Sequence, residues 1–443
     1  MDVFFQQYKP ASSIANYLNA GSKSSGVKTI GLELEHFVVH KESHALVPYM
    51  VERGSSEPSV EQLLEQLKQL YDNAHYEDDS EGVSRLFGMC RKGVCITLEP
   101  GAQLEVSIGP CCSVAELESI YEGFRSEIDP LLESKGLQLL ELGYHPTSLA
   151  RDIPILPKLR YAYMDKYFSD TGKHGMCMMR ATASTQISID YESQDDALLK
   201  FRVANALGPL FAFITDNTPI FEKEQVGVKG GTASKAASDL PVPKRMARMT
   251  CWDDTDPLRS LVAKGTFGDG FSFVTYAEGL LEAPSIFLPQ SNAAEKPSYQ
   301  GFTPFKQLLP NEFIDEELVG HILSLFFYDV RFKNYVELRQ ADALPLRYAL
   351  SFAALVYGIF YNPPALDYYE SCFSYIDIPA IAFAKSSLRN NGYQANVYGR
   401  PATEWLDELI CWAQKGLSVE EAPYLEPLAE LIAERQTLLE LLP

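Results

Sequence analysis

Positive charge is scarce in this sequence: 38 lysines and arginines stand against 59 aspartates and glutamates, which leaves a formal charge of −21. Such a chain repels nucleic acids and anionic membranes, so neither is an expected partner. An acidic protein that handles an anionic nucleotide usually needs divalent cations to bridge the two, and carboxylates are suitable ligands for them. The alternative explanation is that the acidity only keeps the chain soluble.

The sequence also lacks the marks of a zinc-finger, secreted or membrane-spanning protein. Its eight cysteines include no C-x-x-C pair, which argues against a structural zinc site. The N-terminus has no basic segment followed by an apolar stretch, and the longest apolar run, residues 349–361, is too short to cross a bilayer. A reducing cytoplasm is therefore the expected location. It favours free thiols at Cys90 and Cys95 over the alternative, a cross-strand disulfide in a predicted hairpin.

Composition indicates an ordinary globular protein, with 46% hydrophobic and 22% charged residues in a chain of 443. We expect a single catalytic unit, residues 1–443. Within it we expect an N-terminal helix with a flexible lead in residues 1–26 and a C-terminal helical layer in residues 402–443. The C-terminal layer would serve packing or an oligomer surface, such as that of a homodimer. Residues 222–245 read as a loop, either a covering loop or a plain connection.

Four strand-like segments alternate polar and apolar residues. In the first, residues 30–39, Glu33 and Glu35 share one face, because side chains two apart in a strand point the same way. In the second, residues 97–108, Glu99 and Glu105 share a parity, and a Pro-Gly pair between them indicates a bend.

The third and fourth segments repeat the theme. Gln186 lies on the polar face of residues 182–191, and Glu337 and Arg339 project together from residues 335–340. Taken singly, each segment fits a strand with one face in water. If all four lined one concave sheet, about five carboxylates would gather around two or three hard cations. These carboxylates are Glu33, Glu35, Glu99, Glu105 and Glu337.

A different cluster lies in residues 244–259, where basic residues precede an aromatic residue and an acidic turn. Arg248 and Arg259 could bind anionic groups, and Thr255 offers a hydroxyl within the turn. A capped helix after a loop explains these residues equally well.

These segments resemble those of the plant- and proteobacterial-type glutamate-cysteine ligases, within the wider family of γ-glutamyl and carboxylate-amine ligases. The resemblance runs from about residue 28 to about residue 345, which implies that residues 28–345 form the catalytic core. It rests on six motifs in the same order, within residues 30–39, 98–105, 178–190, 201–219, 248–259 and 337–342.

The resemblance implies an α+β fold with a curved, mainly antiparallel, glutamine-synthetase-like sheet covered by helices. It implies ATP-dependent ligation of the γ-carboxyl of glutamate to cysteine through γ-glutamyl phosphate, with Mg²⁺. The alternatives are a ligase for a different amine, or a non-catalytic relative that binds nucleotide or amino acid.

The resemblance also assigns residues to roles. The five carboxylates above would bind magnesium. Arg248 and Arg339 would act in catalysis and on substrate, Gln186 and Trp252 would bind substrate, and Thr255 and Arg259 would bind ATP.

Overall fold

The computed structural model describes residues 8–24, 26–52, 54–79, 81–227, 240–289 and 297–441. Two sequence expectations fall partly outside these residues. They are the start of the N-terminal helix and the Gly-rich centre of the loop predicted for residues 222–245.

A nine-stranded sheet forms the centre of the described residues, with the order β12-β13-β7-β1-β5-β4-β3-β2 and with β6 paired to the far end of β1. All of its strand pairs are antiparallel. The predicted α+β class with a mainly antiparallel sheet is therefore confirmed. The strands are β1 Ile30–His40, β2 Asn73–Asp78, β3 Ser84–Arg91, β4 Val94–Leu98, β5 Leu104–Cys111, β6 Leu137–Leu140, β7 Ser184–Ile189, β12 Val330–Phe332 and β13 Val336–Asp342.

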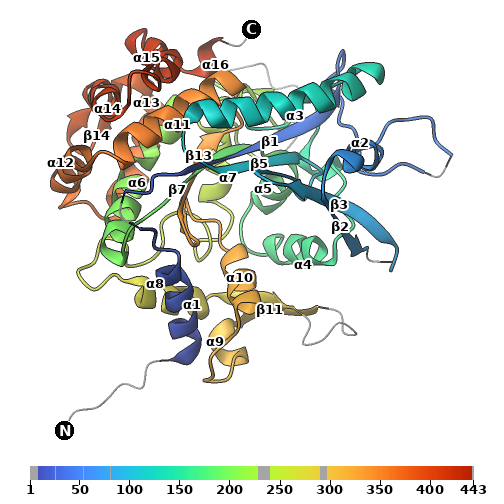
Figure 1. Cartoon of the computed structure of the whole chain (residues 1–443), viewed down its shortest axis with the longest axis horizontal. Helices are drawn as coiled ribbons and strands as arrows, with labels where there is room; N and C mark the ends of the chain where they lie inside the picture. The colour runs from blue at the N-terminus through green and yellow to red at the C-terminus, as the bar shows by residue number, and fades with distance from the viewer. Residues whose placement is uncertain are drawn as a thin grey trace.

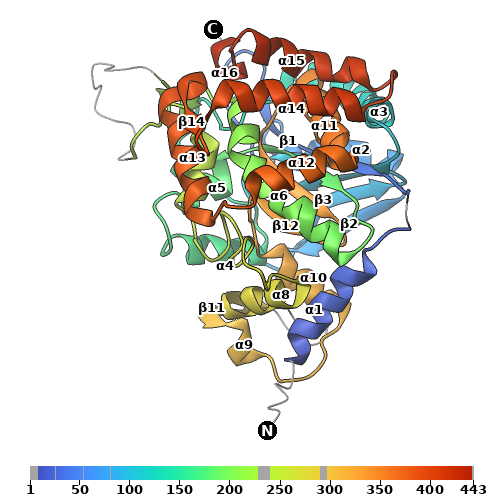
Figure 2. The same cartoon turned by 90° about the vertical axis from the view of Figure 1, so that its left-hand side faces the viewer.

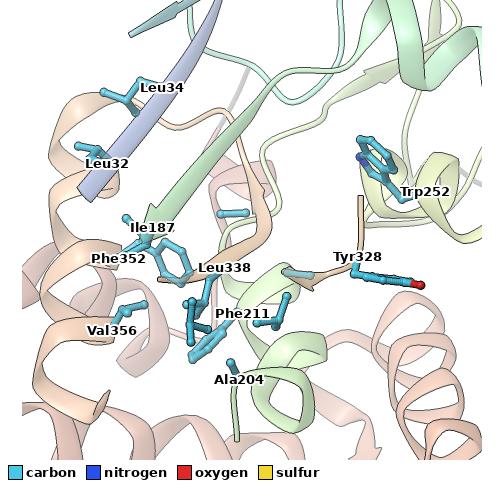
Figure 3. Close-up of a cluster of buried hydrophobic side chains, with 14 of the residues drawn as sticks. Leu32, Leu34, Ile187, Ala204, Phe211, Trp252, Tyr328, Leu338, Phe352 and Val356 are labelled. Carbon is cyan, nitrogen blue, oxygen red and sulfur yellow. The ribbon is translucent and has the colours of Figure 1, made fainter. Parts of the chain in front are cut away.

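One face of the sheet is apolar and is covered by three long helices, α3 Val114–Ser134, α6 Gln194–Ile214 and α11 Leu346–Phe360. The alternation predicted for β1 holds, because Leu32 and Leu34 are fully buried on this face. Figure 3 shows Ile187 and Leu338 of the sheet beside Phe352 of α11. Burial of such side chains supplies the main stabilisation of the fold.

The opposite, polar face carries shorter helices, which lie on the other side of the sheet from α3 and α11 (Figure 1). They are α4 Leu159–Phe168, α5 Gly175–Ala181, α7 Ala247–Asp253 and α10 Glu316–Ser324. The acidic turn at residues 254–257 follows α7, so it ends a helix instead of beginning one. This face contains the candidate site.

The remaining elements lie at the two ends of the molecule (Figure 2). One end holds α1 Lys9–Ala20, α8 Phe273–Glu282, α9 Phe305–Leu308 and the hairpin of β10 Pro284–Leu288 with β11 Ser298–Pro304. The other end holds α14 Ala402–Gly416, α15 Glu426–Ala433 and α16 Leu438–Leu441, which follow α12 Pro363–Phe373 and α13 Ile378–Asn391. Helix α2, Val60–Leu67, packs beside β3, and two short hairpins complete the list, β8 Ile220–Phe221 with β9 Glu224–Gln225 and β14 Asn396–Val397 with β15 Arg400–Pro401.

Helix α6 is the one helix of the described residues that is long and apolar enough by itself to cross a membrane. In this fold 89% of its apolar window is buried inside the protein. The buried helix predicted from residues 349–361 is present as α11, which passes the same test only together with α12, across a bend of 83°.

The expectation of two free thiols in the hairpin of β3 and β4 is wrong in this structure. Cys90 and Cys95 are direct cross-strand partners, with Cα atoms 4.1 Å apart, and they form a disulfide. The tight turn between them brings the two sulfurs within bonding reach. The other six cysteines are free.

Candidate active site

Three glutamates from neighbouring strands meet at one end of the polar face. Glu35 of β1 lies directly opposite Glu105 of β5, and Glu99 follows the end of β4. One carboxylate oxygen from each lies within 4.8 Å of the others. The Pro-Gly bend positions Glu99, because Gly101 approaches Arg180 so closely that a Cβ there would meet its carbonyl oxygen at 2.2 Å. The predicted bend is therefore the device that completes the trio.

Hydrogen bonds fix the direction of these carboxylates. Glu35 accepts from the Ser184 backbone N–H at 2.7 Å, from the Ser184 hydroxyl at 2.8 Å and from Gln186 Nε2 at 2.9 Å. Glu105 accepts from the hydroxyls of Thr97 and Ser107, at 3.1 and 2.8 Å. Both carboxylates are thus held in place before any ligand arrives.

A cation would relieve the repulsion within the trio. Burial, and then the neighbouring acids, raise the pKa of Glu35 and hold that of Glu99 well above its usual range. Two unit charges 4.8 Å apart repel by about 3 kcal/mol at an effective dielectric constant of about 20. A hard divalent cation with oxygen ligands would remove this cost, so the donor set fits Mg²⁺.

Glu33 continues the polar face toward the opposite end. It pairs across the sheet with Gln186 of β7 on one side and with Ser107 of β5 on the other. Burial, followed by repulsion from Glu337 and Glu105, raises the pKa of Glu33 to about 8. Glu33 therefore also lies where a cation would stabilise its ionised form.

Glu337 lies among cations instead of joining the three-glutamate cluster. Its carboxylate contacts Arg331 Nε at 2.7 Å, Lys333 Nζ at 3.0 Å and Arg339 Nη1 at 3.0 Å, and its side chain is completely buried. Burial alone would raise its pKa, but these three cations hold it well below its usual range. Three positive charges against one carboxylate leave a cationic end to the cavity, suited to phosphoryl or carboxylate oxygens.

Arg248 and Trp252 lie one helical turn apart on α7 and face the same cavity. Arg248 is 2% exposed and donates to the backbone carbonyls of Arg339, at 3.2 Å, and Gln340, at 3.4 Å. Its Nε and the indole Nε1 of Trp252 have no hydrogen-bond partner among the described residues. Both groups therefore retain a donor for a ligand.

Thr255 and Arg259 do not line this cavity, so their placement does not support the prediction that they bind ATP. The Thr255 hydroxyl donates to the Cys251 carbonyl at 2.6 Å. Arg259 is completely buried, donates to the Leu325 carbonyl at 2.8 Å and packs on the rings of Tyr167 and Phe326. The acidic turn that looked like a binding motif thus holds the end of α7 in the core.

Several cavity residues were missed by sequence reasoning. Arg331 lies directly opposite Glu337 in the pairing of β12 with β13, and its spacing to Lys333 repeats the i, i+2 pattern that drew attention to β13. That spacing could have revealed both residues. Arg160 of α4 and Met178 and Met179 of α5 also line the cavity, but no local pattern distinguishes Arg160.

The cavity that these residues line has a volume of about 350 Å³. A second cavity, of about 530 Å³, lies at the other end of the same strands and shares Glu33 and Ser107 with the first. Its lining includes Val27, Val94 and Ile108. One polar strand face therefore connects an ionic chamber to a more apolar one.

Comparison with known proteins identifies the family of the chain. The model of glutamate-cysteine ligase family 2 matches residues 29–440. The chain belongs to that family. The resemblance stated from the sequence motifs is thereby confirmed.

Curated relatives in the family include the chloroplastic glutamate–cysteine ligases of Arabidopsis thaliana and Medicago truncatula. Each is 28% identical to this chain, over 355 and 359 residues. The matched region covers 79% and 80% of this chain but 63% and 65% of those enzymes, so the chain spans a little under two thirds of their length.

A crystal structure of glutamate–cysteine ligase from Francisella tularensis, in complex with AMP, shares the fold. The TM-score is 0.53 at 12% identity, and the match covers 93% of this chain and 83% of that one. At this identity the similarity concerns the fold alone.

Proposed function

We propose that this protein is an ATP-dependent ligase that joins the γ-carboxyl of L-glutamate to the amine of L-cysteine. In the first step a γ-carboxylate oxygen of glutamate attacks the γ-phosphorus of ATP, giving γ-glutamyl phosphate and ADP. In the second step the cysteine nitrogen attacks the acyl carbon, loses a proton, and expels phosphate. The product is γ-glutamylcysteine.

The observation that carries this proposal is the separation of charge within one cavity. Glu35, Glu99 and Glu105 gather at one end, and Arg331, Lys333 and Arg339 surround Glu337 at the other. A carboxylate is a poor electrophile until it is phosphorylated, and the transfer spreads negative charge over phosphoryl oxygens. Fixed cations placed before the reaction stabilise that charge without reorganising.

Mg²⁺ would be held by Glu35, Glu99 and Glu105, with Glu33 near enough in the sheet to share a second ion. When bound, it would neutralise phosphate charge and keep the trio ionised. Arg248 and Arg339, which contact one another through the Arg339 carbonyl, would orient the carboxylate of glutamate and the transferring phosphoryl group. Gln186, which is hydrogen-bonded to both Glu35 and Arg339, would hold these two side chains in position.

The second cavity suits the base and ribose of the nucleotide. Its apolar lining matches a purine, and Glu33 and Ser107 form its border with the ionic chamber. A nucleotide lying along this face would place its phosphates beside Lys333 and Arg339. Cysteine would then enter beside Met179 and Trp252 of the first cavity, where the lining is less charged.

The deciding experiment is to incubate the purified protein with Mg-ATP and glutamate, add a panel of amines, and measure ADP together with product mass. Stoichiometric ADP and γ-glutamylcysteine with cysteine would support the proposal. ADP and product with another amine but not with cysteine would retain the ligase and reject the named acceptor. No ADP with any amine would reject the enzyme and favour a binding role.

The cytoplasmic location and a homodimeric state are further proposals. The first draws on the six free cysteines, which suit a reducing compartment, and the second on the Leu- and Glu-rich helices of residues 402–441. A fluorescent fusion and light scattering on the purified protein test them.

A further inference from the structure

A cluster of four charges lies behind the candidate site, in which Lys385 and Asp329 are buried and Asp253 and Arg389 are partly exposed. Lys385 of α13 is 4% exposed, and its Nζ contacts Asp253 Oδ1 at 3.0 Å and Asp329 Oδ2 at 2.6 Å. Arg389, one turn further along α13, contacts Asp253 Oδ2 at 2.5 Å. Two cations therefore balance two carboxylates, and the cluster lies outside the lining of both cavities described above.

Each carboxylate belongs to an element that carries a cavity arginine. Asp253 is the last residue of α7, whose first turn holds Arg248. Asp329 comes directly before β12, which holds Arg331, and its backbone carbonyl accepts the N–H of Arg339 at 3.0 Å. One lysine ammonium thus joins the helix and the strand pair that supply the arginines.

The same two elements also meet on the cavity side, where the Arg248 guanidinium donates to the carbonyls of Arg339 and Gln340 at 3.2 and 3.4 Å. The second of these distances is long for a hydrogen bond. Two such contacts hold the separation of α7 from β13 less firmly than a pair of short, buried ion pairs. The Lys385 cluster is therefore the stronger of the two connections.

We propose that Lys385 is a positioning residue, which fixes α7 against β12 and β13 so that Arg248 and Arg339 can act on one substrate. This inference rests on the proposed function of these arginines. It assigns a role in the site to the C-terminal helices, which lie beyond the segment that carries the sequence motifs. A misplacement of about 1 Å in such a site can cost about 100-fold in rate.

The test must remove the connection without leaving a buried charge unpaired, because a single Lys385→Met change would leave Asp329 without a cation. The double variant K385M/D329N avoids this, since Asp253 keeps its partner Arg389. We expect it to fold, with a KM for glutamate raised about tenfold or more and a KM for Mg-ATP within about twofold of the wild type. The KM for Mg-ATP should change less than the KM for glutamate because the cavity proposed for the nucleotide base lies away from α7.

Two control variants separate positioning from general loss of stability. R85M/D79N removes a similar pair at the β2–β3 end of the sheet, where Asp79 is buried, and the Glu61 that Arg85 also contacts is 26% exposed and stays partly hydrated without it. It should lower stability without changing either KM. K385R keeps the cation and should hold the KM for glutamate within about threefold.

Amide hydrogen exchange provides a readout that does not depend on turnover. In K385M/D329N, residues 247–253 and 329–332 should exchange faster than in the wild type, and in R85M/D79N they should not. If the wild type makes no product, the proposed function fails, and exchange alone decides the inference. If K385M/D329N has the same KM for glutamate as the wild type, or unchanged exchange in residues 247–253 and 329–332, the inference is overturned.

Discussion

Glu337→Gln should destabilise the ligand-free protein and make its stability depend on phosphate. The change removes the one carboxylate that contacts Arg331, Lys333 and Arg339, at 2.7, 3.0 and 3.0 Å, in a site where Glu337 has no solvent exposure. Breaking a buried ion pair by removing one partner costs about 3 to 5 kcal/mol, because the other charge stays buried and unpaired. Here three cations lose a shared partner, so the upper part of that range applies.

Phosphate should recover part of this loss, because an anion can take the place of the missing carboxylate. A ligand that binds only the folded state at about 100 times its Kd contributes about 2.7 kcal/mol. Urea unfolding of wild type and E337Q, with and without phosphate and without divalent cations, measures both effects. E408Q is the matched control, since Glu408 pairs with the partly exposed Arg400 away from the cavity and should cost about 1 kcal/mol or less. A phosphate response in E337Q no larger than in the wild type would refute the reasoning.

Three further predictions follow from other parts of the structure. Glu99→Gln removes one of the three glutamates whose carboxylate oxygens lie within 4.8 Å of one another. The metal-free variant should be no less stable than the wild type, and the rise in Tm caused by millimolar Mg²⁺ should disappear. An unchanged rise in Tm would exclude Glu99 as a ligand. Burial lowers the pKa of His145 to about 4. In the unfolded state this histidine binds a proton below about pH 6.5, whereas in the folded state it stays neutral down to about pH 4. The contribution of His145 to the free energy of unfolding should therefore fall between pH 6.5 and 4 by up to about 3 kcal/mol. His145→Gln should make this fall smaller by a similar amount in urea unfolding, and an identical pH profile would contradict the assignment. The Cys90–Cys95 disulfide predicts that maleimide labels six of the eight cysteines in denatured, unreduced protein; eight labelled residues would show that the pair is reduced as purified.

The sequence predicted the sheet face well because alternation is a local property. Glu33 and Glu35 had to share a face once residues 30–39 formed a strand. The antiparallel register then brought Glu105 opposite Glu35 and Gln186 opposite Glu33. A periodic pattern reveals which residues share a face, and the fold brings Glu35, Glu99 and Glu105 together on it, but it places Glu337 among cations instead.

The structure departs from the sequence expectations at residues whose surroundings depend on contacts distant in sequence. Arg259 looked like an anion-binding group, but the fold buries it against Tyr167 and Phe326, where its guanidinium packs on rings. Arg160 was missed because a single arginine on a short helix shows no periodicity. Cys90 and Cys95 were predicted to be free thiols because a reducing compartment was expected. Their direct cross-strand pairing decides whether a disulfide can form.

Gln186 explains how the acidic and cationic ends coexist on one strand face. Its amide Nε2 donates to Glu35 Oε1 at 2.9 Å, and its Oε1 accepts from Arg339 Nη1. An amide can do both, because it is neutral and carries a donor group and an acceptor group on separate atoms. A carboxylate here would repel Glu35, and a cation would repel Arg339. In the proposed reaction, the neutral residue between them would leave the carboxylates available to a metal ion and the arginines and Lys333 available to phosphate.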